Sequence, residues 1–454
     1  MRLSNIFFMD PPTPGYFLLP LGGQTRYILA MNDLQRPQAA VPSDEPTHCV
    51  PQDIEDILSK GEVQTFFQPL VSVSDRGVLG FEAYARGVVS DRNAIIKPQV
   101  LFDACHSLDT QLKIDRICRQ SALEKFQGIY AKHKNILLFL NVNATALKSD
   151  QTKLGSLESE VQKLGYNPKH VIIELQANSI TIEDHGKFLD RYRDGGFAFC
   201  LDDFHSADLE KLHLVRPSFV KLGRESFTRL AEVSYQRELL TSLRRFAGDM
   251  GCRVAAKGVE TQEEAFLLLD NHIQLQQGFF FTKKKEDTGQ DASQIFQEKI
   301  QELHSRYKER VGQSIREKKL LFEGYNQTMV RILARFEKTA LRQYAEAAQN
   351  ALASAPEALA VFILDEHGRE VGSRLVRVPS QDGKTVLREV RGAQDHSIED
   401  YFLHLQMGFE RYVTHPFISP LDRKRHCLIS RRFFNVEGRS LVLCVEFPAS
   451  SASD

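Results

Sequence analysis

The chain has 454 residues, of which 42% are hydrophobic and 26% are charged, and its formal net charge is −1. This length predicts two or three domains with packed cores. The balance of charge argues against a protein built to bind a nucleic acid polymer, because contacts to phosphate backbones need a surplus of Lys and Arg.

Cysteine usage and hydropathy predict the compartment. The seven cysteines include no Cys-x-x-Cys pair, and several lie inside apolar runs such as FAFCLDD and LVLCVEF. Buried free thiols of this kind indicate a reducing cytoplasm. No apolar run reaches the roughly 20 residues of a membrane-spanning helix, and the N-terminus lacks the pattern of a secretory signal. We therefore expect a cytoplasmic protein with no membrane span.

Residues 1–50 differ from the rest of the chain. They contain PPTPG and RPQAAVPSDEP and show no sustained periodicity. This composition predicts a poorly ordered N-terminal extension, with at most a short hairpin around GYFLLPLGGQTRYILAM.

Residues 51–288 alternate short apolar runs with amphipathic stretches such as ALEKFQGIYAKH and RELLTSLRRFAGDM. Eight runs predict strands: TFFQPLV, GVLGFEAYA, ILLFLNV, HVIIEL, FAFCLDDF, SFVKL, RVAAK and QLQQGFFF. Strands that alternate with helices predict a parallel α/β fold. Eight strands in this length favour a (β/α)8 barrel, with a doubly wound sheet as the rival architecture.

A helical connector is predicted over residues 289–355. Apolar residues recur there at spacings of four and three, at Phe296, Ile300, Leu303, Tyr307 and Val311. This spacing predicts one face of an amphipathic helix, with Gly312 and Gly324 as candidate breaks. The apolar face is suited to pairing across a homodimer.

Residues 356–450 are predicted to form a sheet-rich domain. LAVFILDEHGREV predicts a strand, a DEHG turn and a second strand. CLISRRFFNVEGRSLVLCVEF predicts another hairpin, which turns at Asn435 to Gly438.

Polar residues end most of the predicted strands of residues 51–288. The set comprises Glu82, Asn141, Glu174, Asp202, Asp203, Lys221, Lys257 and Gln277. In a parallel barrel these strand ends lie on one face, where active sites are built. Strand ends are also where loops begin, so some polarity is expected in any fold, and the Asp pair alone is equally typical of a helix N-cap. The whole set predicts a site at the mouth of the barrel.

The residue types in this set narrow the chemistry. Its oxygen donors are Glu82, Asn141, Glu174, Asp202 and Asp203, and no His or Cys joins them. Such a set argues against zinc and copper and suits Mg²⁺, Mn²⁺ or Ca²⁺. Two adjacent aspartates are typical of sites in which metal ions activate water for phosphodiester cleavage. Lys221 would then face phosphate oxygens or the attacking water.

The same residues carry a resemblance to a known family. FFQPLV, GFEAYARG, LFLNVNATAL, VIIEL, CLDDF, FVKLG, AAKGVET and QGFFF resemble, in order and spacing, the motifs of the EAL-domain family. Members are bacterial proteins that cleave or bind cyclic di-GMP. The resemblance covers about residues 55–285 and implies a modified (β/α)8 barrel of the TIM type.

The resemblance also implies roles for individual residues. It implies Mg²⁺ or Mn²⁺ ligands at Glu82, Asn141, Glu174 and Asp202. It places Asp203 and Lys221 beside these ligands. It implies positions near the dinucleotide at Gln68, Arg86 and Gln277. If the protein is an enzyme, Lys221 and Asp203 are the catalytic candidates, and the reaction is the metal-dependent cleavage of cyclic di-GMP to linear pGpG.

Lys257 departs from the family motif. The chain reads AKGVET where the family reads AEGVET, and that Glu serves the second metal and the catalytic water. A protonated lysine neither ligates a metal nor accepts a proton. With two divalent ions the four carboxylates and two lysines sum to +2, and two unit charges ~4 Å apart interact by roughly 4 kcal/mol at an effective dielectric of 20. We expect the ammonium to replace the second metal and contact phosphate; the alternatives are that it swings into solvent or loses its proton on burial.

Three further departures lie near this position. Ala177 replaces a Glu that steadies the loop after the Asp pair, and Gly223 replaces an Asp. The loop itself reads DDFHSADLEKL instead of DDFGTGYSSL, with His205 as either a new ligand or a surface residue. These changes suggest that catalysis no longer constrains the loop.

Three functional hypotheses remain. The first is a catalytically degenerate protein that binds cyclic di-GMP and relays this to a partner or to its C-terminal domain. The second is an active or weakly active phosphodiesterase, and the third is a protein-interaction module that binds no nucleotide. The C-terminal hairpins resemble PAS or Cache-like sensor domains, which gives an α+β domain after the barrel and the helical linker.

Overall fold

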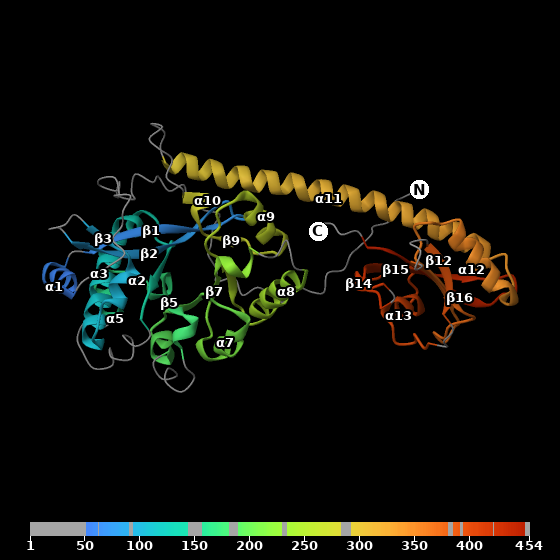
Figure 1. Cartoon of the computed structure of the whole chain (residues 1–454), viewed down its shortest axis with the longest axis horizontal. Coiled ribbons are helices and arrows are strands. Elements are labelled where there is room, and N and C mark those ends of the chain that lie inside the picture. The colour runs from blue at the N-terminus through green and yellow to red at the C-terminus, as the bar shows by residue number, and fades with distance from the viewer. Residues whose placement is uncertain are drawn as a thin grey trace. The chain divides into compact units, whose positions relative to one another are not determined.

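The computed structural model describes residues 51–61, 63–89, 94–143, 157–180, 189–228, 234–282, 292–379, 385–390, 394–420 and 422–449. They form two compact units, divided between Tyr307 and Lys308 (Figure 1). The hairpin expected within residues 1–50 lies outside the described residues. Among the described helices, none combines the length and the apolar character of a membrane-spanning segment.

The first unit is built on a closed barrel. Its strands are β1 (Val63–Ser72), β2 (Gly77–Val89), β3 (Ala94–Ile96), β4 (Leu137–Asn141), β5 (Val171–Gln176), β6 (Ala198–Asp202), β7 (Phe219–Leu222), β8 (Arg253–Ala256) and β9 (Leu275–Gln276). The sheet order is β1-β9-β8-β7-β6-β5-β4-β2-β3, and β1 also pairs with β2. Because β1 joins both ends of the eight-strand path, the predicted barrel is confirmed and the doubly wound sheet is excluded.

The barrel departs from eightfold symmetry at one strand. β1 runs antiparallel to both β2 and β9, whereas the pairs from β2 and β4 round to β8 and β9 are parallel. β3 pairs only with the end of β2 and lies outside the closed ring.

The last predicted strand is shorter than expected. In QLQQGFFF the strand ends at Gln276, and Phe279–Thr282 forms the short helix α10. Gly278 explains the change of direction, because a Cβ there would lie 2.1 Å from the carbonyl oxygen of Val259. The backbone of Gly278 passes directly against the backbone of Val259, which only glycine allows. The chain turns there, and the apolar FFF run forms a helix instead of extending the strand.

Helices surround the barrel. They are α1 (Pro51–Lys60), α2 (Pro98–Asp103), α3 (Leu108–Lys132), α5 (Leu157–Lys163), α7 (Leu209–Val215), α8 (Ser234–Asp249) and α9 (Gln262–Asp270). Single 3-10 turns are η4 (Pro168–His170), η5 (Ala177–Ser179), η6 (Ser206–Asp208) and η7 (Arg224–Ser226). Local sequence sets their starts: Ser107 caps α3 through the N–H of Thr110, and Thr261 and Glu264 form a capping box on α9.

An apolar layer fills the interior of the barrel. It consists of one residue from each of seven strands: Leu70, Phe139, Ile172, Cys200, Phe219, Ala255 and Leu275. The eighth strand contributes Gly80, where a Cβ would lie 2.6 Å from the carbonyl oxygen of Leu137. The interior is thus a packed core that closes the barrel beneath its mouth.

The second unit begins within one long helix. α11 (Ala292–Phe336) continues through Gly312 and Gly324, so the breaks considered at these glycines do not occur. The short η8 (Leu341–Gln343) and the helix α12 (Tyr344–Ala353) follow.

An antiparallel sheet forms the body of the second unit. Its strands are β10 (Ala360–Leu364), β11 (Arg374–Pro379), β12 (Thr385–Val390), β13 (Arg411–Val413), β14 (Phe417–Ile418), β15 (Arg425–Phe434) and β16 (Ser440–Pro448), with α13 (Asp400–Gln406) between β12 and β13. The order is β12-β11-β10-β16-β15-β13, and β14 pairs with β15.

One of the two predicted hairpins is correct. β15 and β16 pair over nine positions around the predicted turn, from Phe434 opposite Ser440 to His426 opposite Pro448. The other is wrong in its second strand, because β10 pairs with β11 and Glu370 contributes only a single bridge to Leu364. After the DEHG turn the side chain of Glu370 is 3% exposed, and only a single bridge forms instead of a ladder.

Candidate functional site

The predicted site residues form a layer directly above the apolar layer of the barrel. Successive side chains of a strand alternate between its faces, so a residue two positions on points to the same side. The residues two positions beyond the apolar layer are Asn141, Glu174, Asp202, Lys221, Lys257 and Gln277. On β1, which runs the opposite way, Gln68 precedes Leu70 by two, and on β2 Glu82 follows Gly80 by two. One geometrical rule therefore brings these positions together at the mouth.

Lys221 is the buried cation of this layer. Its Nζ lies 2.5 Å from Glu82 Oε2 and 2.7 Å from Glu174 Oε2, and its side chain has 0% exposure. The same Nζ is 4.8 Å from the centre of the Phe139 ring in the layer below. Burial alone would lower the pKa of Lys221, but Glu174 and Glu82 outweigh it and raise that pKa well above its usual range.

The pKa values of the two glutamates are shifted in opposite directions. Burial opposes ionisation of Glu82, yet Lys221, Asn141 and Gln277 together hold its pKa below the usual value. Burial, and then the nearby carboxylate of Glu82, raises the pKa of Glu174 well above its usual range. Lys221 and the two amide groups thus favour the ionised form of Glu82 more strongly than burial opposes it, whereas for Glu174 burial has the larger effect.

Lys257 lies between the two aspartates. Its Nζ is 2.7 Å from Asp202 Oδ2 and 2.7 Å from Asp203 Oδ1. These contacts outweigh the effect of burial and raise the pKa of Lys257. The side chain is 25% exposed and directed at the two aspartates, so it does not swing into solvent, and the raised pKa favours its charged form. Burial raises the pKa of Asp202 despite this contact.

The backbone around Asp203 fits this arrangement. Asp203 has a left-handed φ of 47°, which non-glycine residues seldom adopt. A Cβ at position 223 would lie 3.1 Å from Asp203 Oδ1, so the glycine found there leaves room for the Asp203 carboxylate. Gly223 and Lys257 therefore both bear on the position of Asp203.

Neutral polar groups complete the layer. Gln277 Nε2 lies 2.9 Å from Glu82 Oε2, 3.1 Å from Gln68 Oε1 and 3.3 Å from Tyr84 Oη. Asn141 Nδ2 donates to Glu82 Oε1 at 3.0 Å. Arg86 lies four residues beyond Glu82 on β2, outside this layer, with its guanidinium carbon 5.9 Å from the centre of the Phe66 ring.

The loop after the aspartates is held by Lys211. Lys211 Nζ donates to the Ala177 carbonyl oxygen and to Asp208 Oδ1, both at 2.6 Å. Asp208 Oδ2 in turn accepts from the N–H of His205 at 3.1 Å. The His205 ring is 44% exposed and 3.5 Å from Glu225, so it lies at the surface. Where a Glu is expected at position 177, a lysine from α7 anchors the loop instead.

Three residues in or beside the layer were not selected by sequence analysis: Tyr84, Gln176 and Lys211. Gln176 occupies a strand position that carries no distinguishing signal, although its Nε2 donates to Asp202 Oδ2 at 2.7 Å. Lys211 lies on a short helix among other charged residues. The alternation of β2 identifies Tyr84 in retrospect, because it is two residues from Glu82 on the same face.

Few carboxylate oxygens of the layer are free to bind a metal ion. Glu174 Oε1 and Asp202 Oδ1 are buried without a hydrogen-bond partner among the described residues, so two carboxylate oxygens are available to a cation. Beside them, the ammonium of Lys257 already contacts Asp202 and Asp203. Within the described ranges, no group of three or more His, Cys, Asp or Glu side chains is arranged to hold a metal ion. The two lysines explain this, because they stand among the carboxylates.

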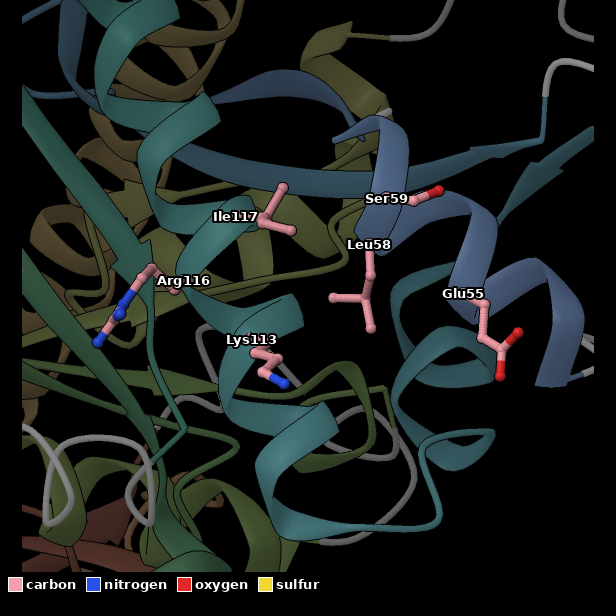
Figure 2. A pocket seen from close by; sticks show the side chains of 6 residues that line it. All are labelled: Glu55, Leu58, Ser59, Lys113, Arg116 and Ile117. Carbon is pink, nitrogen blue, oxygen red and sulfur yellow. The ribbon is translucent and has the colours of Figure 1, made fainter.

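A separate cavity lies between α1 and α3. It has a volume of about 490 Å³ and is lined by Glu55, Leu58, Ser59, Lys113, Arg116 and Ile117. Figure 2 shows Leu58 projecting from α1 into the space beside α3. None of the predicted site residues lines this cavity, so the cavity is separate from the candidate site at the barrel mouth.

Comparison with known families and proteins places the first unit. Residues 52–284 match the EAL domain family. The probable cyclic di-GMP phosphodiesterase PdeB of Escherichia coli (strain K12) is 20% identical over 239 residues, which are 52% of this chain and 45% of PdeB. The blue light- and temperature-regulated antirepressor BluF of the same strain is 21% identical over 223 residues, 48% of this chain and 53% of BluF. The chain thus spans about half the length of these relatives.

A solved structure resembles more of the chain. The Bacillus subtilis YkuI protein, which has an EAL domain and was crystallised with c-di-GMP and calcium, is similar with a TM-score of 0.69. The similarity covers 87% of this chain and 99% of that chain at 17% sequence identity. At this identity the likeness concerns the fold alone.

Proposed function

Since this chain belongs to the EAL domain family, we propose that it binds cyclic di-GMP at the barrel mouth and hydrolyses it slowly or not at all. The observation that carries the proposal is the position of Lys257, whose Nζ lies 2.7 Å from both Asp202 and Asp203. An ammonium group there supplies positive charge to phosphate but accepts no proton from water. The mouth is therefore suited to holding an anionic dinucleotide.

Charge at the mouth supports the binding of one divalent ion, Mg²⁺ or Mn²⁺. The four carboxylates Glu82, Glu174, Asp202 and Asp203 and the two lysines leave a formal charge of −2, which one divalent ion neutralises. A second ion would leave +2 in a poorly hydrated site. Glu82, Asn141, Glu174 and Asp202 would hold the single ion, which supplies charge for contact with a phosphate oxygen.

The chain's own residues have distinct roles in this proposal. Lys221 keeps Glu82 ionised and would remain beside a bound phosphate as a fixed positive charge. Gln277 and Gln68, joined by a hydrogen bond of 3.1 Å, present amide groups toward the dinucleotide. Arg86 lies farther out on β2 and would meet a more distant part of the ligand. Lys257 takes the position at which a carboxylate would assist the attacking water.

Two measurements test the proposal. Calorimetry with cyclic di-GMP and Mg²⁺ is expected to show binding, and chromatography is expected to show little linear pGpG. Lys257→Glu is expected to raise metal-dependent turnover by at least about tenfold, because one restored general base is worth that or more. Lys257→Met is the matched control, which removes the charge without restoring a carboxylate and should stay slow.

The outcomes separate the alternatives. Rapid hydrolysis by the unaltered chain would mean that the protein is an active phosphodiesterase and would contradict the proposal. Absence of binding by the folded chain at high micromolar ligand would favour an interaction module. The relative BluF is an antirepressor, which is the observation that favours this alternative.

We also propose that ligand binding is relayed to a partner protein or to the second unit. The long helix α11 supports this, because it contributes Ile300 and Leu303 to the core of the first unit and Met329 and Phe336 to the core of the second. A homodimer through the exposed apolar side chains of α11, such as Ile315, and a PAS or Cache-like character of the second unit belong to the same proposal. Light scattering with and without cyclic di-GMP tests the dimer.

A further inference from the structure

The second unit buries a continuous polar network on one face of its sheet. Alternation along the strands places Arg374 of β11, His426 of β15 and Glu446 of β16 on the face that carries Phe362 and α13. The network, called the sheet network below, consists of Asp422, His426, Glu446, Arg374, Glu370, His396 and Tyr401.

Arg374 stands at the centre of the sheet network. Its Nη2 is 2.6 Å from Glu370 Oε1, its Nη1 is 3.7 Å from Glu446 Oε1, and its guanidinium carbon is 3.9 Å from the centre of the Phe362 ring. Among the described residues, no member of the sheet network has a buried side-chain nitrogen or oxygen without a hydrogen-bond partner. The network therefore leaves no unsatisfied group for a ligand, and its own protonation is what can change.

Two histidines in the sheet network differ in what they require. His396 Nδ1 lies 2.6 Å from Tyr401 Oη, and its Nε2 lies 3.1 Å from Glu370 Oε1. A neutral imidazole satisfies both contacts, because one nitrogen accepts from the hydroxyl and the other donates to the carboxylate.

His426 faces a carboxylate at each ring nitrogen. Its Nδ1 is 3.0 Å from Glu446 Oε2, and its Nε2 is 3.2 Å from Asp422 Oδ2. Ionised carboxylates only accept hydrogen bonds, so both nitrogens must carry hydrogen and the ring must be the imidazolium. Burial alone would lower the pKa of His426, but its bonds to Glu446 and Asp422 outweigh burial and raise it.

The charges around His426 make the proton important. The charged groups that face it are Glu446 from β16 and Asp422 from the segment before β15, with Arg374 of β11 beyond Glu446. The Phe417 ring of β14 packs edge-on against it at 6.2 Å. Arg374 is also paired with Glu370, so a protonated His426 is needed to balance Glu446 and Asp422, and loss of the proton leaves an acceptor nitrogen against a carboxylate oxygen.

The segment next to His426 forms only a short ladder, although Ser419 also bonds to the backbone of Lys424 and Arg423. β14 is two residues long and pairs only with β15, through Phe417 opposite His426 and Ile418 opposite Arg425. Ile418 is 60% exposed, and Arg423 has a left-handed φ of 59°. The contact between Asp422 and His426 is the ionic one among the contacts that hold this edge of the sheet, so it is the one that a change of protonation alters.

We propose that His426 is a proton-dependent latch, which holds β14 and Asp422 against β15 when its ring is protonated and releases them when the proton is lost. A group whose pKa is higher in the folded state stabilises that state fully below its ordinary value of 6.5, and this stabilisation is lost as pH rises through the folded value. The latch is therefore closed in mildly acidic solution and opens toward alkaline pH.

Hydrogen exchange of the full chain tests the latch. In peptides that contain Phe417 and Ile418, the opening equilibrium, corrected for intrinsic exchange, is expected to rise about tenfold between pH 6 and pH 8, because adjacent carboxylates strengthen the binding of a proton by about that factor or more. His426→Gln is expected to be open at both pH values. His396→Gln is the matched control, because its ring needs no charge, and it should keep the pH dependence of the unaltered chain.

A second measurement keeps the test independent of how the variants fold. The ring proton resonances of His426 in the unaltered chain should titrate above pH 6.5, later than those of an exposed histidine. A neutral His426 ring at pH 6, a flat exchange profile in the unaltered chain, or an unchanged profile in folded His426→Gln would each overturn the proposal.

Discussion

Two buried ionic groupings, one in each unit, differ in what they leave unsatisfied. At the barrel mouth, Glu174 Oε1, Asp202 Oδ1 and Gln277 Oε1 are buried without a hydrogen-bond partner among the described residues. In the sheet network, all of whose members are described, no buried side-chain nitrogen or oxygen lacks a hydrogen-bond partner. Buried polar atoms without partners cost free energy unless something else satisfies them. The difference indicates that the mouth is arranged for an added ligand, whereas the sheet network is arranged for its own protons.

The comparison also concerns how cations are used. Lys221 and Lys257 each contact two carboxyl groups that belong to different strands or to a strand and its following loop. Each ammonium group is a compact charge on a flexible side chain, so it can change position when a divalent ion or a phosphate binds. Arg374 is planar and stacked on Phe362, so it fixes geometry more strongly than a lysine.

The largest expected effect comes from Lys221→Met in the barrel. The change leaves Glu82 and Glu174 buried without the cation that contacts both, which is expected to lower the free energy of unfolding of the barrel by about 3–5 kcal/mol at neutral pH. Native-state hydrogen exchange in peptides of β4 to β7 measures this. Lys257→Met, at a partly exposed position, is the control with the smaller loss. An equal or larger loss of unfolding free energy in Lys257→Met would contradict the expectation that Lys221, the fully buried lysine, contributes more to stability.

Arg374→Met tests the sheet network. It removes the charge next to Glu370 and the stacking on Phe362, so the second unit is expected to lose about 2–3 kcal/mol. The chain has no Trp, so exchange in peptides of β10 and β16 is preferable to intrinsic fluorescence. Arg331→Met is the matched control, because Arg331 is 65% exposed and its pair with Glu357 should contribute no more than about 1 kcal/mol. Equal losses would show that the network gives no more than surface pairing.

Lys211→Met tests whether Lys211 holds the loop beside the mouth. Loss of the bonds to Ala177 and Asp208 is expected to destabilise that loop locally by about 1–2 kcal/mol, read as faster exchange in peptides containing Asp208. Lys113→Met, whose pair with Asp109 is exposed at 60% and 74%, should change its own region by less than about 1 kcal/mol. Unchanged exchange near Asp208 would mean that other contacts hold the loop.

The sequence by itself determined the barrel and the membership of its mouth. Eight apolar runs ending in polar residues specify both the strands and, through the alternation of a strand, which side chains share a layer. The oxygen-rich composition of that layer and the lysine at position 257 could also be read from the sequence. These features depend on local patterns, which a sequence records directly.

Only the tertiary structure decided which charges meet. The positions of Lys257 between Asp202 and Asp203, and of Lys211 at the Ala177 carbonyl, depend on loop geometry that no periodicity encodes. The sheet network joins residues from Glu370 to Glu446, and its histidines differ only through the partners that folding gives them. Pairing between distant side chains follows from register, turn shape and burial acting together, and the protonation of a buried group depends on those neighbours more than on its own identity.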